Sequence, residues 1–179
     1  MDWNSQILVK INGLSGRNKW LDAFGRAGAE WVILAILAWY VAGVFITKVT
    51  WPQIITPFVI LSVAWLVGLL LNFIIGKIIK EPRPYLTNPE IKLLFVPLSG
   101  WKSFPSDHAM SVFLILFFGL LFHLPAVWSL LPLALWVAWG RLYAGLHYPL
   151  DIIGGICVAG LLAIVLKYVV SYFVLFNLL

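Results

Sequence analysis

The sequence predicts an all-α integral membrane protein: a bundle of five transmembrane helices, or six, preceded by an amphipathic helix at the membrane interface. Hydrophobic residues make up 63% of the 179 residues and charged residues only 11%, whereas soluble domains average about one half and one quarter. The run from Val49 to Gly76 also carries no charge over 28 residues, and about 20 suffice to cross a hydrocarbon core. These two observations favour a bilayer over water as the solvent of most of the chain.

The N-terminal residues 1–28 are expected to lie at the membrane surface. Apolar side chains at Trp3, Ile7, Ile11 and Leu14 recur at helical spacing, with polar residues between them. Such a pattern is typical of a helix that lies in the interface plane. The first full span is predicted at residues 29–47, because 17 uncharged residues separate Glu30 from Lys48.

The remaining spans follow from the apolar blocks and their breaks. The second span is predicted at 54–76, and the polar stretch 77–102 after it is expected to be an active-site loop, because long loops are usually functional or disordered. Residues 103–146 divide at "HLPAVW" into two helices of about 21 residues, and 149–174 form the fifth span. The whole chain, 1–179, is expected to be one membrane-embedded domain.

Three polar clusters stand at predicted helix ends: "GKIIKEPRPY", "SFPSDHA" and "GRLYAGLHYPLD". Ionisable residues beside membrane spans are costly and usually mark function. If successive spans alternate in direction, the end of the second span, the start of the third, the end of the fourth and the start of the fifth share one membrane face. We therefore expect the three clusters to meet at one site.

The third cluster supplies a histidine, a carboxylate and an arginine. The four-residue step from His147 to Asp151 lets imidazole and carboxylate meet on one helix face. A carboxylate on one ring nitrogen leaves the other free as nucleophile or ligand. Arg141, with Arg83 of the first cluster, offers planar forks that match phosphate oxygens.

The other clusters add an acid and further anion-binding groups. Ser106, Asp107 and His108 begin a helix, where free amides favour an anion and where His108 can protonate a leaving oxygen. Asp107 is expected to cap this helix or to pair with a lysine or arginine. Lys77 and Lys80 are expected to reach the same site from the end of the preceding helix.

This constellation resembles the type 2 phosphatidic acid phosphatase superfamily of membrane lipid phosphatases. The family motifs K-x6-R-P, P-S-G-H and S-R-x5-H-x3-D match residues 76–151 in order and in spacing, and three motifs together are specific. The resemblance implies that His147 attacks phosphorus to form a phosphohistidine, that Asp151 orients it and that His108 protonates the leaving group. It implies no metal and no cofactor, and it assigns phosphoryl oxygens to Ser106, Arg83, Arg141 and a lysine.

Three positions depart from the family motifs. Gly76 stands at the motif lysine, with Lys77 one residue and Lys80 four residues further on, and Gly140 stands at the motif serine. Asp107 stands at the motif glycine, and Ser-Asp-His in this place is similar to the undecaprenyl pyrophosphate phosphatases of the bacitracin-resistance type. We expect the change at Gly140 to tune the site without disabling it.

Other functions are consistent with parts of the sequence. A zinc-dependent membrane hydrolase would use His108, His147 and Asp151 as ligands, although four nearby cations would oppose the ion. A transporter would use the charges as a pathway, although no internal repeat is visible. Among lipid phosphatases, undecaprenyl pyrophosphate is the leading substrate, and lipid A 1-phosphate, phosphatidylglycerol phosphate and phosphatidate follow.

The expected partners are the lipid (pyro)phosphate substrate and membrane lipids. The net charge of +5 could suggest nucleic-acid binding, but the sequence has no basic helix and no aromatic-basic pattern, so nucleic acid is not predicted as a partner. No obligate protein partner is predicted either. We expect a bacterial inner membrane location with the site facing outward. The excess of Lys and Arg on the site's side favours the cytoplasm instead, but several of these charges serve phosphate binding.

Overall fold

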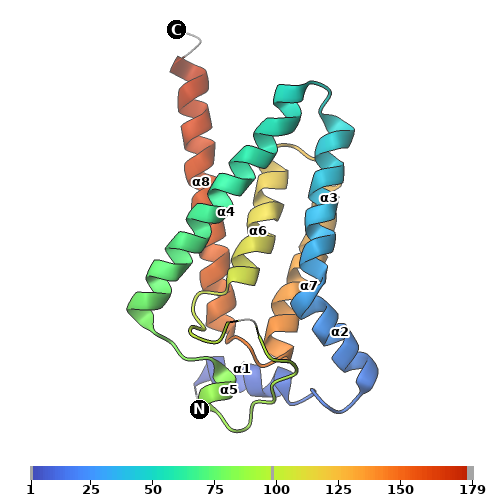
Figure 1. Ribbon diagram of the computed structural model, residues 1–179, viewed down its shortest axis with the longest axis vertical. Helices are drawn as coiled ribbons and strands as arrows, with labels where there is room; N and C mark the ends of the chain where they lie inside the picture. Colours follow the sequence, from blue (N-terminus) through green and yellow to red (C-terminus); the bar gives the residue numbers. More distant parts are fainter. Residues whose placement is uncertain (1, 98, 177–179) are drawn as a thin grey trace.

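The computed structural model describes residues 2–97 and 99–176, with side chains through Val169 (Figure 1). Helices account for all regular secondary structure in this part of the chain, which confirms the all-α prediction. The helices are α1 (Trp3–Asn12), α2 (Lys19–Glu30), α3 (Val32–Thr47), α4 (Trp51–Ile79), α5 (Pro84–Thr87), α6 (Asp107–Leu121), the 3-10 helix η1 (Val127–Ser129), α7 (Leu130–Tyr143) and α8 (Pro149–Phe176).

Helix α6 forms the centre of the bundle, with α3, α4, α7 and α8 around it (Figure 1). Beyond its polar first turn, Ser111 is the one polar side chain of α6, and Met110, Leu114 and Phe118 are fully buried. A helix that is hydrophobic all round must be covered all round, so its neighbours enclose it. The polar first turn of α6 is thereby fixed at one end of the bundle.

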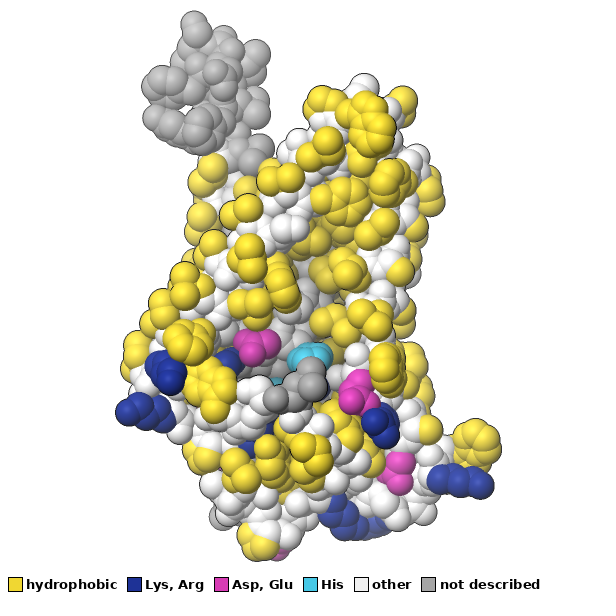
Figure 2. Space-filling model, in the orientation of Figure 1, with side chains coloured by type: hydrophobic (Ala, Val, Ile, Leu, Met, Phe, Trp, Pro, Cys, Tyr) yellow, Lys and Arg dark blue, Asp and Glu magenta, His cyan; other side chains and the backbone are white. Residues whose placement is uncertain are grey.

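The described helices differ in how well they fit a membrane. The stretch Trp51–Thr87, which contains α4, and Pro149–Val169 of α8 are long and apolar enough to span a bilayer, and α2 and α3, bent by 50° at Trp31, qualify if taken together. Figure 2 shows hydrophobic side chains over the upper part of the molecule and charged ones gathered at the lower end. This agrees with an integral membrane protein, and the count of five or six spans stays a prediction.

The predicted length of the helices within residues 103–146 was wrong. Helix α6 has 15 residues and α7 has 14, against about 21 expected for each. The chain from Ser103 to Ser106 is not helical, and the Ser106 side chain caps α6 by accepting from the amide of Ala109. A serine hydroxyl satisfies one of the free amides of the first turn, so the helix starts at Asp107.

Helix α1 lies across the charged end of the bundle, roughly perpendicular to the long helices (Figure 1). The predicted helix therefore forms, whereas its place at a membrane interface is still a prediction. Its last residue, Asn12, is buried and donates through Nδ2 to the carbonyls of Lys92 at 2.8 Å and Tyr143 at 2.9 Å, while its Oδ1 accepts from the Lys92 amide. Because a buried amide needs all these partners, α1 fixes the 77–102 loop against the end of α7.

Candidate active site

The three polar clusters meet at the end of the bundle, around a cavity of about 360 Å³. One wall consists of residues that the motifs singled out: Arg83, Asp107, His108, Arg141 and His147. Residues from α2, the bend after it and the 77–102 loop line the rest of the cavity: Glu30, Trp31, Phe95, Val96, Pro97 and Ser99. Figure 2 shows histidine side chains at the bottom of this hollow, flanked by an acidic side chain.

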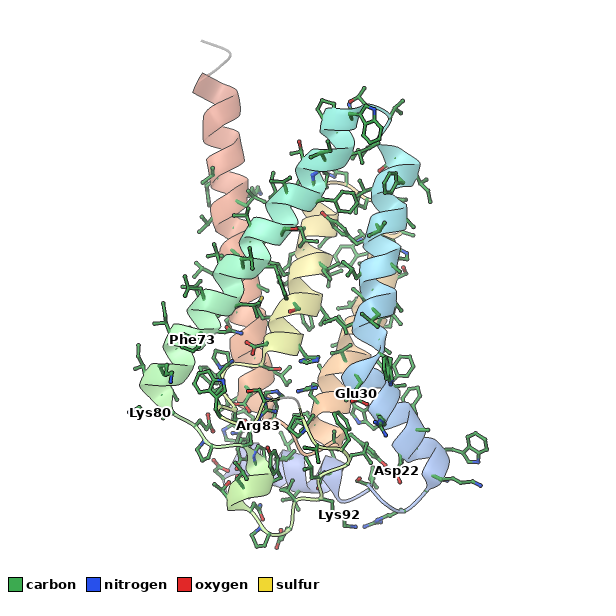
Figure 3. The ribbon with its side chains drawn as sticks, in the orientation of Figure 1. Asp22, Glu30, Phe73, Lys80, Arg83 and Lys92 are labelled. Atoms are coloured by element: carbon green, nitrogen blue, oxygen red, sulfur yellow. The ribbon has the colours of Figure 1, made fainter. Side chains whose placement is uncertain are left out.

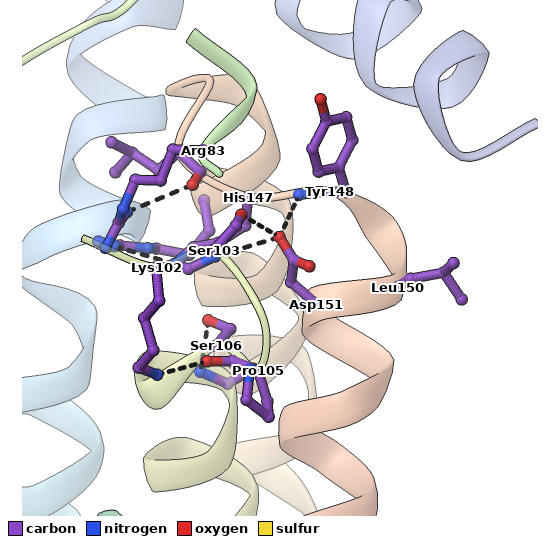
Figure 4. A network of polar contacts seen from close by, with 12 residues as sticks. Arg83, Lys102, Ser103, Pro105, Ser106, His147, Tyr148, Leu150 and Asp151 are labelled. Carbon is purple, nitrogen blue, oxygen red and sulfur yellow. Dashed lines mark hydrogen bonds and ion pairs between the residues drawn. The ribbon is translucent and has the colours of Figure 1, made fainter. Parts of the chain in front are cut away.

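His147 lies between a carboxylate and a guanidinium. Its Nδ1 is 3.4 Å from Asp151 Oδ2 (Figure 4), and its Nε2 is 3.4 Å from Arg141 Nη2. Nδ1 forms no hydrogen bond at this distance, and a contraction of a few tenths of an ångström would make one, as catalytic contacts often tighten on substrate binding. The ring thus has one nitrogen toward Asp151 and the other toward the arginine-lined cavity.

Asp151 is held rigidly behind the histidine. It is fully buried, and its Oδ2 accepts from the Ser103 hydroxyl at 2.5 Å and from the Tyr148 amide at 2.7 Å (Figure 4). Its own carbonyl accepts from the Ser106 amide, which links the start of α8 to the start of α6. These contacts define the direction from which the carboxylate faces His147.

The electrostatic surroundings keep His147 neutral. Burial lowers the pKa of His147 well below its usual range, and the guanidiniums of Arg141 and Arg83 lower it further. A neutral imidazole keeps a lone pair on one nitrogen, which a nucleophile requires. The geometry directs that lone pair into the cavity if Nδ1 carries the proton toward Asp151.

The two arginines are anchored through one arm each. Arg141 donates from Nη1 to the carbonyl of Ala29 at 3.1 Å, and Arg83 donates from Nη1 to the carbonyl of Leu146 at 3.3 Å. Both residues are buried, and the Nε of each has no hydrogen-bond partner within the described part of the chain. Anchored guanidiniums with free donors suit an oxyanion that accepts several hydrogen bonds.

Gly140, which stands at the motif serine, has a packing role. A Cβ at this position would lie 2.6 Å from the amide nitrogen of Ala29 and 2.8 Å from the carbonyl carbon of Gly28. Glycine therefore lets the backbone of α2 approach α7 closely, and this approach brings the Ala29 carbonyl to Arg141. Glycine at the position of the motif serine is thus required by the close packing of α2 on α7.

Ser106 caps α6, and His108 lies in its first turn. His108 lines the cavity, whereas Ser106 is fully buried and its hydroxyl is engaged as the helix cap. Asp107 does not cap the helix; it pairs with a lysine, as the sequence allowed, and that lysine is Lys102 at 2.9 Å.

The predicted place of Lys77 and Lys80 in the site was wrong. Both are exposed on α4 or at its end, and Lys77 lies over the rings of Phe73 and Trp101. Figure 3 shows Lys80 at the outer end of α4, away from Arg83. Helix α4 ends at Ile79, and the next residue, Lys80, has the left-handed conformation, which turns the chain before Arg83 enters the site.

Two residues of the site were missed from the sequence. Ser103 holds Asp151, and the buried Lys102 pairs with Asp107. Ser103 is the first residue of the second cluster and Lys102 directly precedes it, and this position was the available signal. Neither belongs to a motif, so spacing alone did not distinguish them from loop residues.

Comparison with known protein families supports the resemblance to membrane lipid phosphatases that the three motifs indicated. A family model described as the PAP2 superfamily matches residues 57–175. The chain belongs to this superfamily. The match includes all three clusters, so the resemblance found in the motifs is confirmed and the protein is a membrane PAP2 lipid phosphatase by family.

Curated relatives include two bacterial proteins. The chain is 28% identical over 156 residues to undecaprenyl-diphosphatase BcrC of Bacillus subtilis, and this alignment covers 87% of this chain and 78% of the relative. It is 34% identical over 99 residues to putative undecaprenyl-diphosphatase YbjG of Escherichia coli, and this alignment covers 54% of this chain and 48% of the relative. The second alignment thus spans about half of either protein.

Two solved structures share the fold. LpxE of Aquifex aeolicus superposes with a TM-score of 0.69 at 24% identity, covering 94% of this chain and 97% of that one. A PAP2-type phosphatidylglycerolphosphate phosphatase of Bacillus subtilis gives 0.63 at 22% identity, covering 96% and 88%. At this level of identity the likeness establishes the arrangement of helices and nothing about substrate.

Proposed function

We propose that the protein removes the terminal phosphate from a lipid pyrophosphate, with undecaprenyl pyrophosphate as its main substrate, through a phosphohistidine at His147. The observation that carries this proposal is the contact of His147 Nε2 with the Arg141 guanidinium while Nδ1 faces Asp151. An incoming phosphoryl group bound by the guanidinium lies next to the nitrogen that attacks it. Such proximity removes much of the entropic barrier of a two-molecule reaction.

The reaction divides into two steps. In the first, Nε2 of His147 forms a bond to the terminal phosphorus, the bond from phosphorus to the bridging oxygen breaks, and His108 gives its proton to that oxygen. In the second, water attacks the phosphohistidine, His108 takes a proton from the water, and inorganic phosphate leaves. Asp151 stabilises the imidazolium character that His147 acquires, and the arginines stabilise the phosphoryl charge.

A charged pair beside the opening of the cavity favours a substrate with a diphosphate headgroup. Arg26 pairs with Glu30 at 2.6 Å, and its guanidinium lies 5.5 Å from the ring centre of Phe95; Glu30 and Phe95 both line the cavity. This arrangement holds a further cation next to the opening, beyond Arg83 and Arg141. The names of the BcrC and YbjG relatives support the same substrate.

The zinc alternative finds no support in the side chains. It requires His108, His147 and Asp151 to converge on one ion, but within the described residues no group of three His, Cys, Asp or Glu side chains is close enough to hold a metal. Asp151 also uses Oδ2 for Ser103 and Tyr148. A lipid A 1-phosphatase or a phosphatidylglycerol phosphate or phosphatidate phosphatase remains the second candidate, since one of the two solved neighbours is by name a phosphatidylglycerolphosphate phosphatase.

Phosphate release by the purified protein, measured on each of these lipids in one detergent, tests the proposal. We expect the highest kcat/KM on undecaprenyl pyrophosphate. A higher value on lipid A 1-phosphate or on phosphatidate would assign the second candidate instead, and no release from any of them would contradict a phosphatase function.

We further propose that the protein resides in the bacterial inner membrane with its site facing outward, where a carrier pyrophosphate is exposed after transfer of its cargo. Glu90 lies on the site's side of the bundle and Val49 at the other end, and both are exposed. Single cysteines at these positions, in a Cys157→Ala background, report orientation with an impermeant maleimide on intact cells. We expect labelling at position 90 only, whereas labelling at position 49 only would place the site in the cytoplasm.

A further inference from the structure

Lys102 is a buried cation that no motif contains. Only 6% of it is exposed, and its Nζ donates to the carbonyl of Pro105 at 2.8 Å (Figure 4). The same Nζ donates to Asp107 Oδ1 at 2.9 Å. Lysine is seldom buried unless its charge has a function or a partner. An ammonium has three N–H donors, and within the described residues two are engaged, which leaves one for another acceptor.

The stem of Lys102 fills the space beside Gly76 on α4. A Cβ at Gly76 would lie 2.5 Å from Lys102 Cδ, so any larger residue there would collide with the lysine. Gly76 is the position at which the K-x6-R-P spacing asks for a lysine. A lysine therefore occupies this space after all, but it enters from the 77–102 loop and not from α4.

The end of Lys102 is fixed by two further residues. Asp107 Oδ1 accepts from Lys102 Nζ and also from Asn72 Nδ2 at 2.8 Å, and Asn72 is buried one helical turn before Gly76. Asp107 itself lines the cavity beside His108. This network of Asn72, Asp107 and Lys102 holds the ammonium directly behind Asp107, a residue that lines the cavity, and near enough for its charge to lower the pKa of His147.

We propose that Lys102 is a phosphate-binding residue of the active site and that Asp107 and Asn72 position it. The inference rests on the proposed phosphatase function and adds a third cation to Arg83 and Arg141. It also assigns a role to Asp107: a carboxylate beside an anionic substrate is repulsive when alone, but it is favourable when it holds a lysine whose remaining donor faces phosphate oxygens.

The first test compares Lys102→Ala with Lys92→Ala. Lys92 is a matched control, because it lies in the same loop and its Nζ also donates to a backbone carbonyl, that of Ser15, but it is exposed. Loss of one charge-assisted hydrogen bond corresponds to about 10- to 100-fold in kcat/KM. We expect this loss for Lys102→Ala, together with a weaker competitive inhibition by inorganic phosphate, and no loss for Lys92→Ala.

Two double variants separate phosphate binding from other roles. If Lys102 only neutralised Asp107, then Lys102→Ala combined with Asp107→Asn would recover activity; we expect it to stay as low as Lys102→Ala. In the variant Gly76→Lys with Lys102→Ala, the collision at 2.5 Å is removed and the nearest contacts become 3.2 Å to Phe104 O and Trp101 Cη2, which small shifts relieve. We expect this relocated lysine to restore activity at least tenfold over Lys102→Ala.

The inference is overturned if Lys102→Ala matches Lys92→Ala in kcat/KM and in phosphate inhibition, if the Asp107→Asn double variant recovers, or if the relocated lysine restores nothing. Gel filtration and thermal unfolding in detergent identify any variant that is misfolded, and Lys102→Gln then takes the place of Lys102→Ala. A wild-type protein that releases no phosphate would instead refute the proposed function itself, so the two failures are distinct.

Discussion

Replacing Asp151 by asparagine removes the negative charge behind His147 with almost no change in shape. The carboxylate lies 3.4 Å from His147 Nδ1 and is fully buried. At an effective dielectric constant of about 20, a charge pair at this distance is worth about 5 kcal/mol, which corresponds to roughly a few thousandfold in rate when the histidine becomes cationic in the transition state. We therefore expect Asp151→Asn to lower kcat by at least about 1000-fold, with a smaller change in KM.

Ser103→Ala provides the graded comparison. It removes the hydrogen bond of the Ser103 hydroxyl to Asp151 Oδ2 and leaves that of the Tyr148 amide. We therefore expect kcat to fall about 10- to 100-fold. Initial rates of phosphate release at saturating undecaprenyl pyrophosphate, on variants with wild-type thermal unfolding, give both values. An Asp151→Asn variant within tenfold of wild type, or one more active than Ser103→Ala, would refute the role given to this carboxylate.

The remaining predictions concern the cations, metals and pH. Arg83→Ala and Arg141→Ala should each lower kcat/KM far more than Lys77→Ala or Lys80→Ala, because the two lysines are exposed; one of these lysine variants as inactive as the arginine variants would contradict this. EDTA should leave phosphate release unchanged and vanadate should inhibit it, whereas loss with EDTA that zinc restores would favour a metalloenzyme. The pKa of His147 is lowered in the folded protein, so below about pH 6.5 the unfolded chain binds a proton on this ring that the folded protein does not bind. The free energy of unfolding therefore decreases as the pH falls from 7. Thermal unfolding between pH 7 and 5.5 should show a smaller decrease for His147→Gln than for wild type, and equal slopes would refute the shift.

The meeting of the three clusters could be predicted from the sequence. Helical spans must alternate in direction, so the ends that carry Arg83, His108 and His147 fall on one side whatever the details of packing. The approach of His147 to Asp151 was also predicted, but the reason was wrong: His147 lies two residues before α8, so the two residues do not share a helix face. The meeting of the clusters depends on chain topology, which the pattern of residues determines directly.

The lysine could not be predicted in the same way. The motif spacing points to α4, but the lysine beside Gly76 comes from Lys102, which is 26 residues further along the chain. The path of the 77–102 loop decides this contact, and that path depends on distant partners such as Asn12 of α1, which holds the backbone at Lys92. A loop fixed by tertiary hydrogen bonds leaves no periodic signal in its own sequence.

Helix bounds were missed for a related reason. The sequence counted Ser103 to Ser106 as the start of a span because apolar composition continues nearby, but these residues serve the site: Ser103 binds Asp151 and Ser106 caps α6. The backbone there stays out of the helix so that these side chains reach their partners. Local hydropathy carries no information about these tertiary contacts, so it could not predict where α6 begins.

The most direct test of the account is to identify the phosphorylated residue. Lipid pyrophosphate labelled at its terminal phosphate is mixed with wild-type protein, the reaction is quenched within milliseconds in alkali, where phosphohistidine survives, and the peptides are sequenced by mass spectrometry. The account predicts label on His147 alone and no label in His147→Ala, which should also release no phosphate while remaining folded. Label on His108 or on another residue, or near-normal turnover by His147→Ala, would contradict it.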